Sequence, residues 1–371
     1  MNRENTMHPL AYKLRRVLLE DIGLSQGDSI LIAVSGGSDS MALLHLLASI
    51  RPWLPLELTA AYIDHGLRPD ESPQEWALVQ AVCKQLQVAS TCSQVDVHAV
   101  AAQRKLSLEH AARDCRYSAL EHIRQEISAK WLALAHTADD QVEELLLRLL
   151  RGGSRGALAG MRLHSGKRIR PVLGVRKKEL LAYLAQNSLS FCHDSSNDEL
   201  RFLRNRIRHH LLPLLEQEYD AGIRSALLKC AANLGEDEAL LESLQEQAWH
   251  RCISSQVMIK ANGISQPVWH LALPVFTDLA PALQRRVLER LLYTSQSQAS
   301  YRHIMALLQL AATGTPGKEL HLRNGLRAVV QQDSIAFTFP WGKGATRRSC
   351  KKNLNVCSVE PGGGSDLLAA D

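Results

Sequence analysis

Long hydrophobic runs are missing from this sequence: no stretch approaches the roughly 18 uncharged apolar residues that a membrane-spanning helix needs. The first five residues are polar, and no apolar block precedes a small-residue cleavage site of the kind that a secretory leader carries. We therefore expect a cytoplasmic protein that has no membrane partner.

Cysteine pairs at metal-binding spacing are also missing. The eight cysteines are scattered and form no Cys-x-x-Cys pair, so neither a zinc site nor a disulfide framework has its usual spacing. Free thiols are expected. Aromatic residues make up only 5% of the chain and form no stripe on which bases could stack.

Positive charge is concentrated in two places, although the net charge is only +5. Between residues 145 and 178 there are ten Lys or Arg and no Asp or Glu. The second cluster consists of four arginines and two histidines: Arg201, Arg204, Arg206, Arg208, His209 and His210. This distribution suits a polyanion such as a nucleic acid, and the alternative is a solvated surface.

The 371 residues, 46% of them apolar, have room for two folded domains. In the first part, short apolar runs alternate with helical runs. The runs predict strands near residues 29–34, 56–63, 90–97, 131–135 and 169–173, and helices near 41–50, 75–86, 108–127 and 139–150. Such alternation predicts an α/β fold with a doubly wound parallel sheet, whose ligands bind beyond the carboxyl ends of the strands.

The pattern changes after about residue 220. Residues 222–234 and 236–252 are typical of helices, and residues 319–339 alternate as in strands, with turns at Asn324-Gly325 and at residues 331–334. We therefore predict one domain over residues 1–218 and a smaller, mainly helical α+β domain over 219–340. Residues 341–371 form a glycine-containing tail that we expect to be disordered.

A Gly/Ser segment lies between the first predicted strand and helix and consists of Ser35, Gly36, Gly37, Ser38, Asp39 and Ser40. Glycine allows close backbone approach, so successive N–H groups can surround phosphate oxygens at the start of a helix. The segment lacks the lysine of a GxxxxGKS/T loop and the spacing of GxGxxG, so it supports neither a Walker nucleotidase nor a dinucleotide dehydrogenase. A plain turn is the remaining alternative.

This SGGSDS segment resembles the pyrophosphate loop of the N-type ATP pyrophosphatases, which have an adenine nucleotide alpha hydrolase-like fold. Five further segments resemble the tRNA(Ile)-lysidine synthetases within that superfamily. They read DHGLR from Asp64, EHAARDCRY from Glu109, AHTADD from Ala135, LRGGSRGALAGM from Leu150, and Ser196-Asn197 followed by FLRNRIRHHLLPLLE from Phe202. The resemblance covers about residues 30–216.

The resemblance implies an ATP-dependent ligation of L-lysine to C2 of the wobble cytidine of a tRNA(Ile) with a CAU anticodon, through an adenylated cytidine. ATP and magnesium are the implied cofactors, with Asp39 as the magnesium ligand, and a homodimer is compatible with the family. The chain departs from the family pattern where Glu143-Glu144 replaces Glu-Thr, and where the C-terminal domain of longer members is not recognisable beyond Phe339.

The AHTADD segment supplies the implied catalytic residues His136 and Asp140, with Asp139 beside them. Asp140 would orient the lysine ammonium and help to remove its proton. A metal trio formed by these three residues is the alternative. We interpret Glu143 and Glu144 as surface acids of a first helical turn, Glu144 pairing with Arg148.

The implied arginines fall into two groups. Arg113 and Arg116 would support the α-phosphate or the target cytosine, or else lie on a solvated surface. The residues assigned to tRNA contact are Asp139, Arg151, Arg155, Arg204, Asn205, Arg206 and Arg208.

The sequence leaves three other functions to weigh. A tRNA-thiolation enzyme would need catalytic cysteines or an iron-sulfur site, and this chain has no Cys-x-x-Cys pair; we expect no cysteine near the Gly/Ser loop. Amide synthesis by a GMP or NAD synthetase would leave the basic clusters without a purpose. A non-catalytic nucleotide-binding module would have little use for the AHTADD carboxylates.

Overall fold

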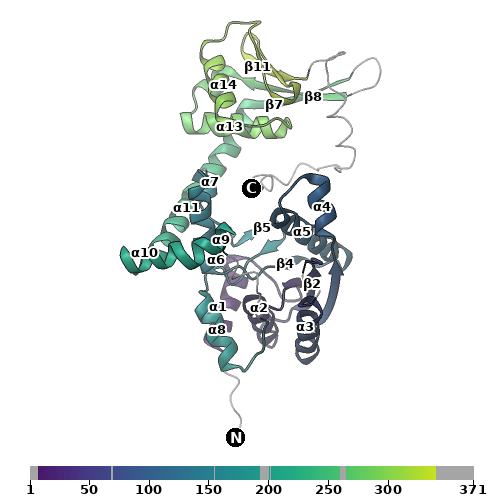
Figure 1. Cartoon of the computed structure of the whole chain (residues 1–371). Helices are drawn as coiled ribbons and strands as arrows, with labels where there is room; N and C mark the ends of the chain where they lie inside the picture. The colour runs from purple at the N-terminus through teal and green to yellow at the C-terminus, as the bar shows by residue number, and fades with distance from the viewer. Residues whose placement is uncertain are drawn as a thin grey trace. The chain divides into compact units, whose positions relative to one another are not determined.

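The computed structural model describes residues 7–67, 70–153, 155–192, 200, 202–259 and 265–339 (Figure 1). Ser196, Asn197, Arg201 and the tail therefore lie outside the described residues. The chain divides into two compact units between Gly235 and Glu236. The domain boundary predicted after residue 218 coincides with the end of α10 (Leu212–Glu218), whereas the units divide inside α11 (Ile223–Cys252).

The first unit contains a mixed sheet that is parallel except at one edge. In its described part, six strands follow the order β3-β2-β1-β4-β6-β5, and only β5 runs antiparallel to its neighbour. The strands are β1 (Ser29–Val34), β2 (Glu57–Asp64), β3 (Ala89–Gln94), β4 (Trp131–Ala133), β5 (His164–Ser165) and β6 (Arg168–Ile169). The predicted parallel sheet is confirmed.

Helices cover both faces of this sheet, which explains why β1 is apolar throughout. Ile30 and Ile32 pack with α1, α2, α3 and α8, whereas Leu31 packs with α5. The helices of this unit are α1 (Pro9–Arg16), α2 (Ser38–Ser49), α3 (Ser72–Leu86), α4 (Val97–Arg104), α5 (Leu108–Glu126), α6 (Ala138–Leu150), α7 (Arg155–Leu158), α8 (Lys177–Gln186), α9 (Leu203–Arg206) and α10, with π-helical turns at Val17–Asp21 and Ile207–Leu211.

The helices differ from the prediction in three places. The helix expected at residue 41 begins at Ser38, because Gly37 is already the extended N-cap. Helix α4 was not predicted. The two helices expected around Gly235 are one helix, α11, since a single interior glycine costs only about 1 kcal/mol.

The second unit combines an antiparallel sheet with helices. In its described part, five strands follow the order β7-β8-β11-β10-β9. Its elements after α11 are β7 (Ile253–Ile259), β8 (Ser265–Ala272), α12 (Leu273–Thr277), α13 (Pro281–Thr294), α14 (Tyr301–Thr313), β9 (Glu319–His321), β10 (Arg327–Val330) and β11 (Ser334–Thr338). The turn at Asn324-Gly325 is confirmed, and both residues have the positive φ that it requires, +59° and +80°. The hairpin of β7 and β8 was not predicted.

Among the described residues, no helix is both long enough and apolar enough to cross a membrane.

Candidate active site

The Gly/Ser loop joins the end of β1 to the first turn of α2. Ser40 Oγ accepts a hydrogen bond from Ser35 N at 3.1 Å and donates one to Gly37 O at 2.9 Å, which holds the loop closed. The first backbone N–H groups of a helix have no partner within the helix, and the helix dipole makes this end positive. The loop therefore presents backbone donors to an anion, as the sequence predicts.

Gly36 brings the loop close to two other elements. Its φ is +79°, and a Cβ at this position would lie 3.3 Å from Glu75 Cβ on α3. Glu75 is buried and accepts a hydrogen bond from Tyr62 Oη at 2.7 Å. Burial, and then this bond, raises the pKa of Tyr62, so the phenol stays protonated.

Cys192 also contacts the loop, because its backbone N donates to Gly36 O at 2.9 Å. The expectation that no cysteine lies near the loop is therefore wrong in space: a segment distant in sequence returns to the loop. Burial, followed by the charge of Glu75, raises the pKa of the Cys192 thiol. A raised pKa disfavours the reactive thiolate.

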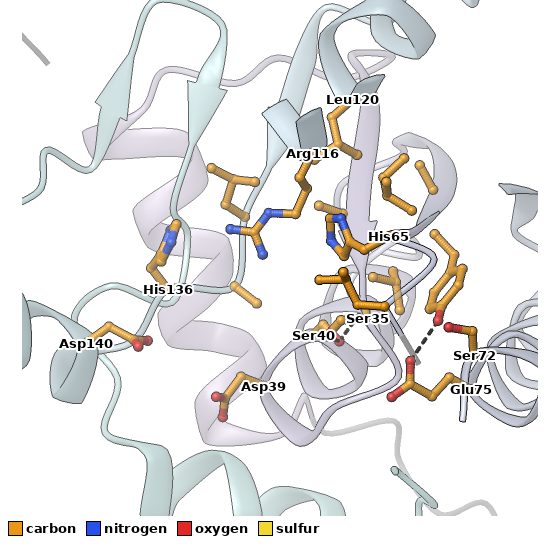
Figure 2. Close-up of a pocket in the computed structure, with 18 of the residues that line it drawn as sticks. Ser35, Asp39, Ser40, His65, Ser72, Glu75, Arg116, Leu120, His136 and Asp140 are labelled. Atoms are coloured by element: carbon orange, nitrogen blue, oxygen red, sulfur yellow. Dashed lines mark hydrogen bonds between the residues drawn. The ribbon is translucent and has the colours of Figure 1, made fainter. Parts of the chain in front are cut away.

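A cavity of about 360 Å³ opens above the loop, at the carboxyl ends of β1, β2 and β4. Figure 2 shows the Arg116 guanidinium pointing into the space between His136 and His65, with Asp39 and Asp140 on the opposite side. The polar residues that line the cavity are Ser35, Asp39, Ser40, Tyr62, His65, Ser72, Glu75, Arg116, His136, Asp140, Arg204, Asn205 and Arg208. Phosphate donors, cations and carboxylates thus share one chamber.

His136 follows β4 and is a neutral group at physiological pH. Burial lowers its pKa to about 3, and the opposing attraction of Asp140 does not compensate. Within the described residues, its buried Nδ1 has no hydrogen-bond partner. A buried polar atom on the cavity wall that no protein group satisfies is suited to a ligand.

Asp140 has two differently engaged oxygens. Oδ2 accepts hydrogen bonds from Thr137 N and Thr137 Oγ1, both at 2.8 Å, and forms the capping box of α6. Oδ1 lies 3.4 Å from Arg204 and 3.7 Å from Arg208. Burial alone would raise the pKa of Asp140, but Arg204, Thr137 and His136 together lower it. Asp140 is therefore an anion in the cavity.

Asp39, at the start of α2, is the second cavity carboxylate. Burial raises its pKa, and this effect exceeds the opposing attraction of Lys177, whose Nζ lies 3.5 Å away. Magnesium is commonly held by one or two carboxylates together with substrate phosphates, so a carboxylate beside a phosphate loop fits that ion. In the described parts of the chain, no group of three or more His, Cys, Asp or Glu could hold a metal by itself.

The metal trio of His136, Asp139 and Asp140 is therefore not formed. Asp139 is held outside the cavity, because its carboxylate accepts a hydrogen bond from Lys177 N at 2.7 Å and pairs with Arg224 at 3.2 Å.

The surface interpretation of Glu143 and Glu144 is wrong, since only 1% and 5% of these residues are exposed. Glu143 pairs with Arg204 at 3.0 Å and with Arg208 at 2.6 Å. Glu144 pairs with Arg148 at 2.8 Å, as predicted, and lies 3.8 Å from Arg204. The arginine spacing of four residues, which places both on one helix face, was the available signal for a buried acid opposite them.

The predicted tRNA residues consequently occupy different environments. Arg204 and Arg208 lie in the cavity wall with buried Asn205 beside them, whereas Arg206 and Arg151 are exposed. Arg155 lies in α7, and its side chain is outside the described residues. Of the α5 pair, Arg116 lines the cavity, and exposed Arg113 lies 5.8 Å from the Tyr117 ring.

Comparisons with known proteins agree with this arrangement. Residues 7–215 match the PP-loop domain family, and residues 271–335 match the TilS substrate binding domain. The chain is 37% identical over 322 residues to the tRNA(Ile)-lysidine synthase of Bacillus subtilis, covering 85% of this chain and 66% of that protein. The protein of the same name from Geobacillus kaustophilus is 35% identical, with 85% and 68% covered. The chain belongs to the tRNA(Ile)-lysidine synthase family.

A solved structure is similar in fold. The U34-tRNA thiolase NcsA of Methanococcus maripaludis, with its 4Fe-4S cluster, aligns with a TM-score of 0.52 at 17% identity, over 61% of this chain and 78% of that one. At this identity the likeness concerns the fold alone. The family membership disfavours thiolation, and each match to a lysidine synthase spans about two thirds of the relative's length.

Replacing Gly36 by valine should abolish ATP binding while the protein stays folded. A β-branched side chain at a φ of +79° is strained, and its Cβ would be in tight contact with Glu75. Either effect would displace the backbone N–H groups that are to bind phosphate. Gly27→Val is the matched control, because Gly27 has a φ of +84° but a Cβ there would have nothing within 4 Å, and Gly27 does not line the cavity. Calorimetric titration measures the ATP affinity of both variants. An ATP affinity equal to that of the wild type in a folded Gly36→Val protein would contradict the loop assignment.

Acid should destabilise the protein partly through His136. Its pKa is about 3 in the folded state and 6.5 ordinarily, so below pH 6.5 the unfolded chain binds a proton that the folded chain does not. The free energy of unfolding should therefore fall by up to about 1.4 kcal/mol per pH unit as the pH drops from 6.5 towards 3, and this contribution is fully present above 6.5.

His136→Gln should remove that slope, whereas replacement of the exposed His98 by glutamine should keep it. Urea unfolding at pH 7 and pH 5.5 measures the difference. Identical pH dependence in the wild type and in His136→Gln would show that the folded imidazole is not neutral.

Proposed function

We propose that this chain ligates L-lysine to C2 of the wobble cytidine of a tRNA(Ile) with a CAU anticodon, with ATP and magnesium as cofactors. The observation that carries the proposal is one cavity containing a phosphate loop, the cation Arg116 and the carboxylates Asp39 and Asp140. Family membership supports the reaction, and the 271–335 match supports tRNA as the polynucleotide.

The triphosphate of ATP would lie over the Gly/Ser loop. The backbone N–H groups at the start of α2 and the hydroxyl of Ser35 would donate to the β- and γ-phosphates, while the Ser40 hydroxyl stays bonded to Gly37 O. Asp39 would hold the magnesium ion, which neutralises charge on the leaving pyrophosphate. Arg116 projects into the same cavity and is suited to the α-phosphate.

In the first step, the O2 oxygen of the cytosine would attack the α-phosphorus. A bond forms between O2 and phosphorus, and the bond to the β-phosphate oxygen breaks, releasing pyrophosphate. The protein's contribution is to align these atoms and to stabilise developing negative charge with Arg116 and the loop donors. The neutral His136 can hydrogen-bond the base or the nucleotide without adding a charge.

In the second step, the ε-amine of lysine would attack C2. The new bond joins Nε to C2, the bond from C2 to O2 breaks, and AMP leaves with that oxygen. Asp140 would attract and orient the incoming ammonium through Oδ1. Because the pKa of Asp140 is lowered, this carboxylate is a weak proton acceptor, and we assign it orientation ahead of proton removal.

Loss of the ammonium proton would be assisted by the surrounding guanidinium groups. Arg204 and Arg208 lie within 4 Å of the Asp140 carboxylate, and nearby cations lower the pKa of an amine. Water would then carry the proton away. Arg204 and Arg208 thus belong to the lysine side of the cavity in this proposal, and exposed Arg206 and Arg151 remain assigned to tRNA phosphates.

The amino-acid specificity of the reaction provides a direct test. The purified protein is incubated with magnesium, ATP, bulk bacterial tRNA and one labelled amino acid at a time. Label should enter tRNA from lysine alone, and only when ATP is present. Incorporation of another amino acid, or none from lysine into a tRNA(Ile) transcript with a CAU anticodon, would contradict the proposed function.

Asp140→Asn should separate the two chemical steps. The amide keeps the shape and can still accept the Thr137 bonds, but it loses the charge that attracts the ammonium. tRNA-dependent pyrophosphate release without lysine should persist, and lysine incorporation should fall at least tenfold, which corresponds to about 1.4 kcal/mol. Both are measured in single-turnover reactions. Equal loss of pyrophosphate release and lysine incorporation would place Asp140 in the ATP site instead.

A further inference from the structure

The segment that follows α6 is fastened to that helix by a side-chain amide. Gln141 Nε2 donates to Met161 O at 3.0 Å, and Met161 N donates to Gln141 Oε1 at 2.6 Å. One primary amide therefore satisfies both backbone groups of one residue. Gly160, the residue before Met161, has a φ of +77°, and a Cβ there would lie 2.8 Å from Gln141 Nε2. The contact requires glycine at 160 and an amide at 141.

Arg148, two turns further along α6, holds the middle of the same segment. Its Nη1 donates to Ala157 O at 2.7 Å and to Gly160 O at 3.4 Å, while its Nε donates to Glu144 Oε1 at 2.8 Å. The side chain is half-buried, and the planar guanidinium can satisfy the carboxylate and the carbonyls at once. Two α6 side chains thus determine the path of residues 157–161.

The helix that makes these contacts, α6, also contacts the arginines of the cavity wall. Glu144 Oε2 lies 3.8 Å from Arg204 Nη1, and Glu143 bridges Arg204 and Arg208. Gln141 and Arg148 do not themselves line the cavity. One helix therefore holds the cavity arginines with its buried acids and the following segment with two polar side chains.

The fastened segment is flanked by exposed cations. Arg151 is the C-cap of α6, before the segment, and Arg162 directly follows residue 161; both are exposed. In the part of the chain from residue 145 to 178 that the structure describes, Lys167, Arg168 and Lys178 are exposed as well, whereas Arg148, Arg170, Arg176 and Lys177 are half-buried. Of these exposed cations, Arg151 and Arg162 bound the fastened segment, so the distance between their side chains depends on the path of that segment. Exposed cations are the ones that a polyanion can contact.

We infer that Gln141 and Arg148 are positioning residues for the tRNA: they fix residues 157–161 so that the flanking exposed cations match the phosphates while the wobble base enters the cavity. This inference rests on the proposed function, and it concerns the tRNA alone. Loose cations would still attract the tRNA, but they would have to be ordered on binding, which weakens affinity without altering the chemistry in the cavity.

Gln141→Leu keeps the volume of the side chain and removes both hydrogen bonds. The KM for a tRNA(Ile) transcript should rise about tenfold, as expected when bonds of ordinary strength no longer order the segment. The kcat at saturating tRNA and the KM for ATP should stay within about twofold. Gln80→Leu, an exposed glutamine of α3, is the matched control and should change none of these values.

Two further variants test the contact from its other members. Gly160→Ala should reproduce the Gln141→Leu effect, because its Cβ would displace the amide. Arg148→Lys should be intermediate, because a single ammonium cannot bond Glu144 and the carbonyls together. Thermal unfolding confirms that each variant is folded.

Filter binding of the same transcript, at several salt concentrations and without ATP or lysine, separates this inference from the proposed function. Weaker binding with an unchanged salt dependence in folded Gln141→Leu supports the positioning role, whether or not the wild type transfers lysine, because the same phosphate contacts form once the cations are ordered. Unchanged tRNA affinity in Gln141→Leu and Gly160→Ala overturns it. A joint fall of kcat and ATP affinity also overturns it, because α6 would then be a scaffold of the cavity only.

Discussion

The candidate active site depends on the burial of one carboxylate. Glu143 is almost wholly removed from solvent, and an uncompensated charge there would cost several kcal/mol. Arg204 and Arg208 supply the compensation and are thereby fixed against α6, although more than fifty residues separate them from it. The cavity wall on that side is a consequence of this pairing. Removal of Glu143, or of the two arginines, would leave a buried ion without a partner.

The opposite side of the cavity is built from backbone. The phosphate loop carries no cation, and its shape is held by Ser40 hydroxyl bonds and by the close fit of Gly36 over Glu75. Positive charge near the loop comes from other elements: Arg116 on α5 lines the cavity, and Lys177 at the start of α8 pairs with Asp39. The site therefore forms only when elements from the whole first unit are assembled.

Local patterns predicted the parts of this structure that local forces determine. The apolar run of β1 indicated a strand buried on both faces, and the glycines of the loop indicated a phosphate site. The surface assignment of Glu143 failed because acids in the first turns of a helix are ordinarily exposed. Here Glu143 is buried because α9, which is distant in sequence, packs against it and places Arg204 on its carboxylate. Cys192 was missed for the same reason, since its backbone bond to Gly36 connects distant segments.

Asp140 illustrates how a folding contact prepares a binding group. Its Oδ2 is committed to the start of α6, so the side-chain torsions are set when the helix forms. The free energy needed to restrict those torsions, on the order of 1 kcal/mol for a side chain of this kind, has been spent before any substrate arrives. Oδ1 is then a stationary anion. A ligand that binds it does not have to order the carboxylate, and a longer side chain such as glutamate would lose this advantage.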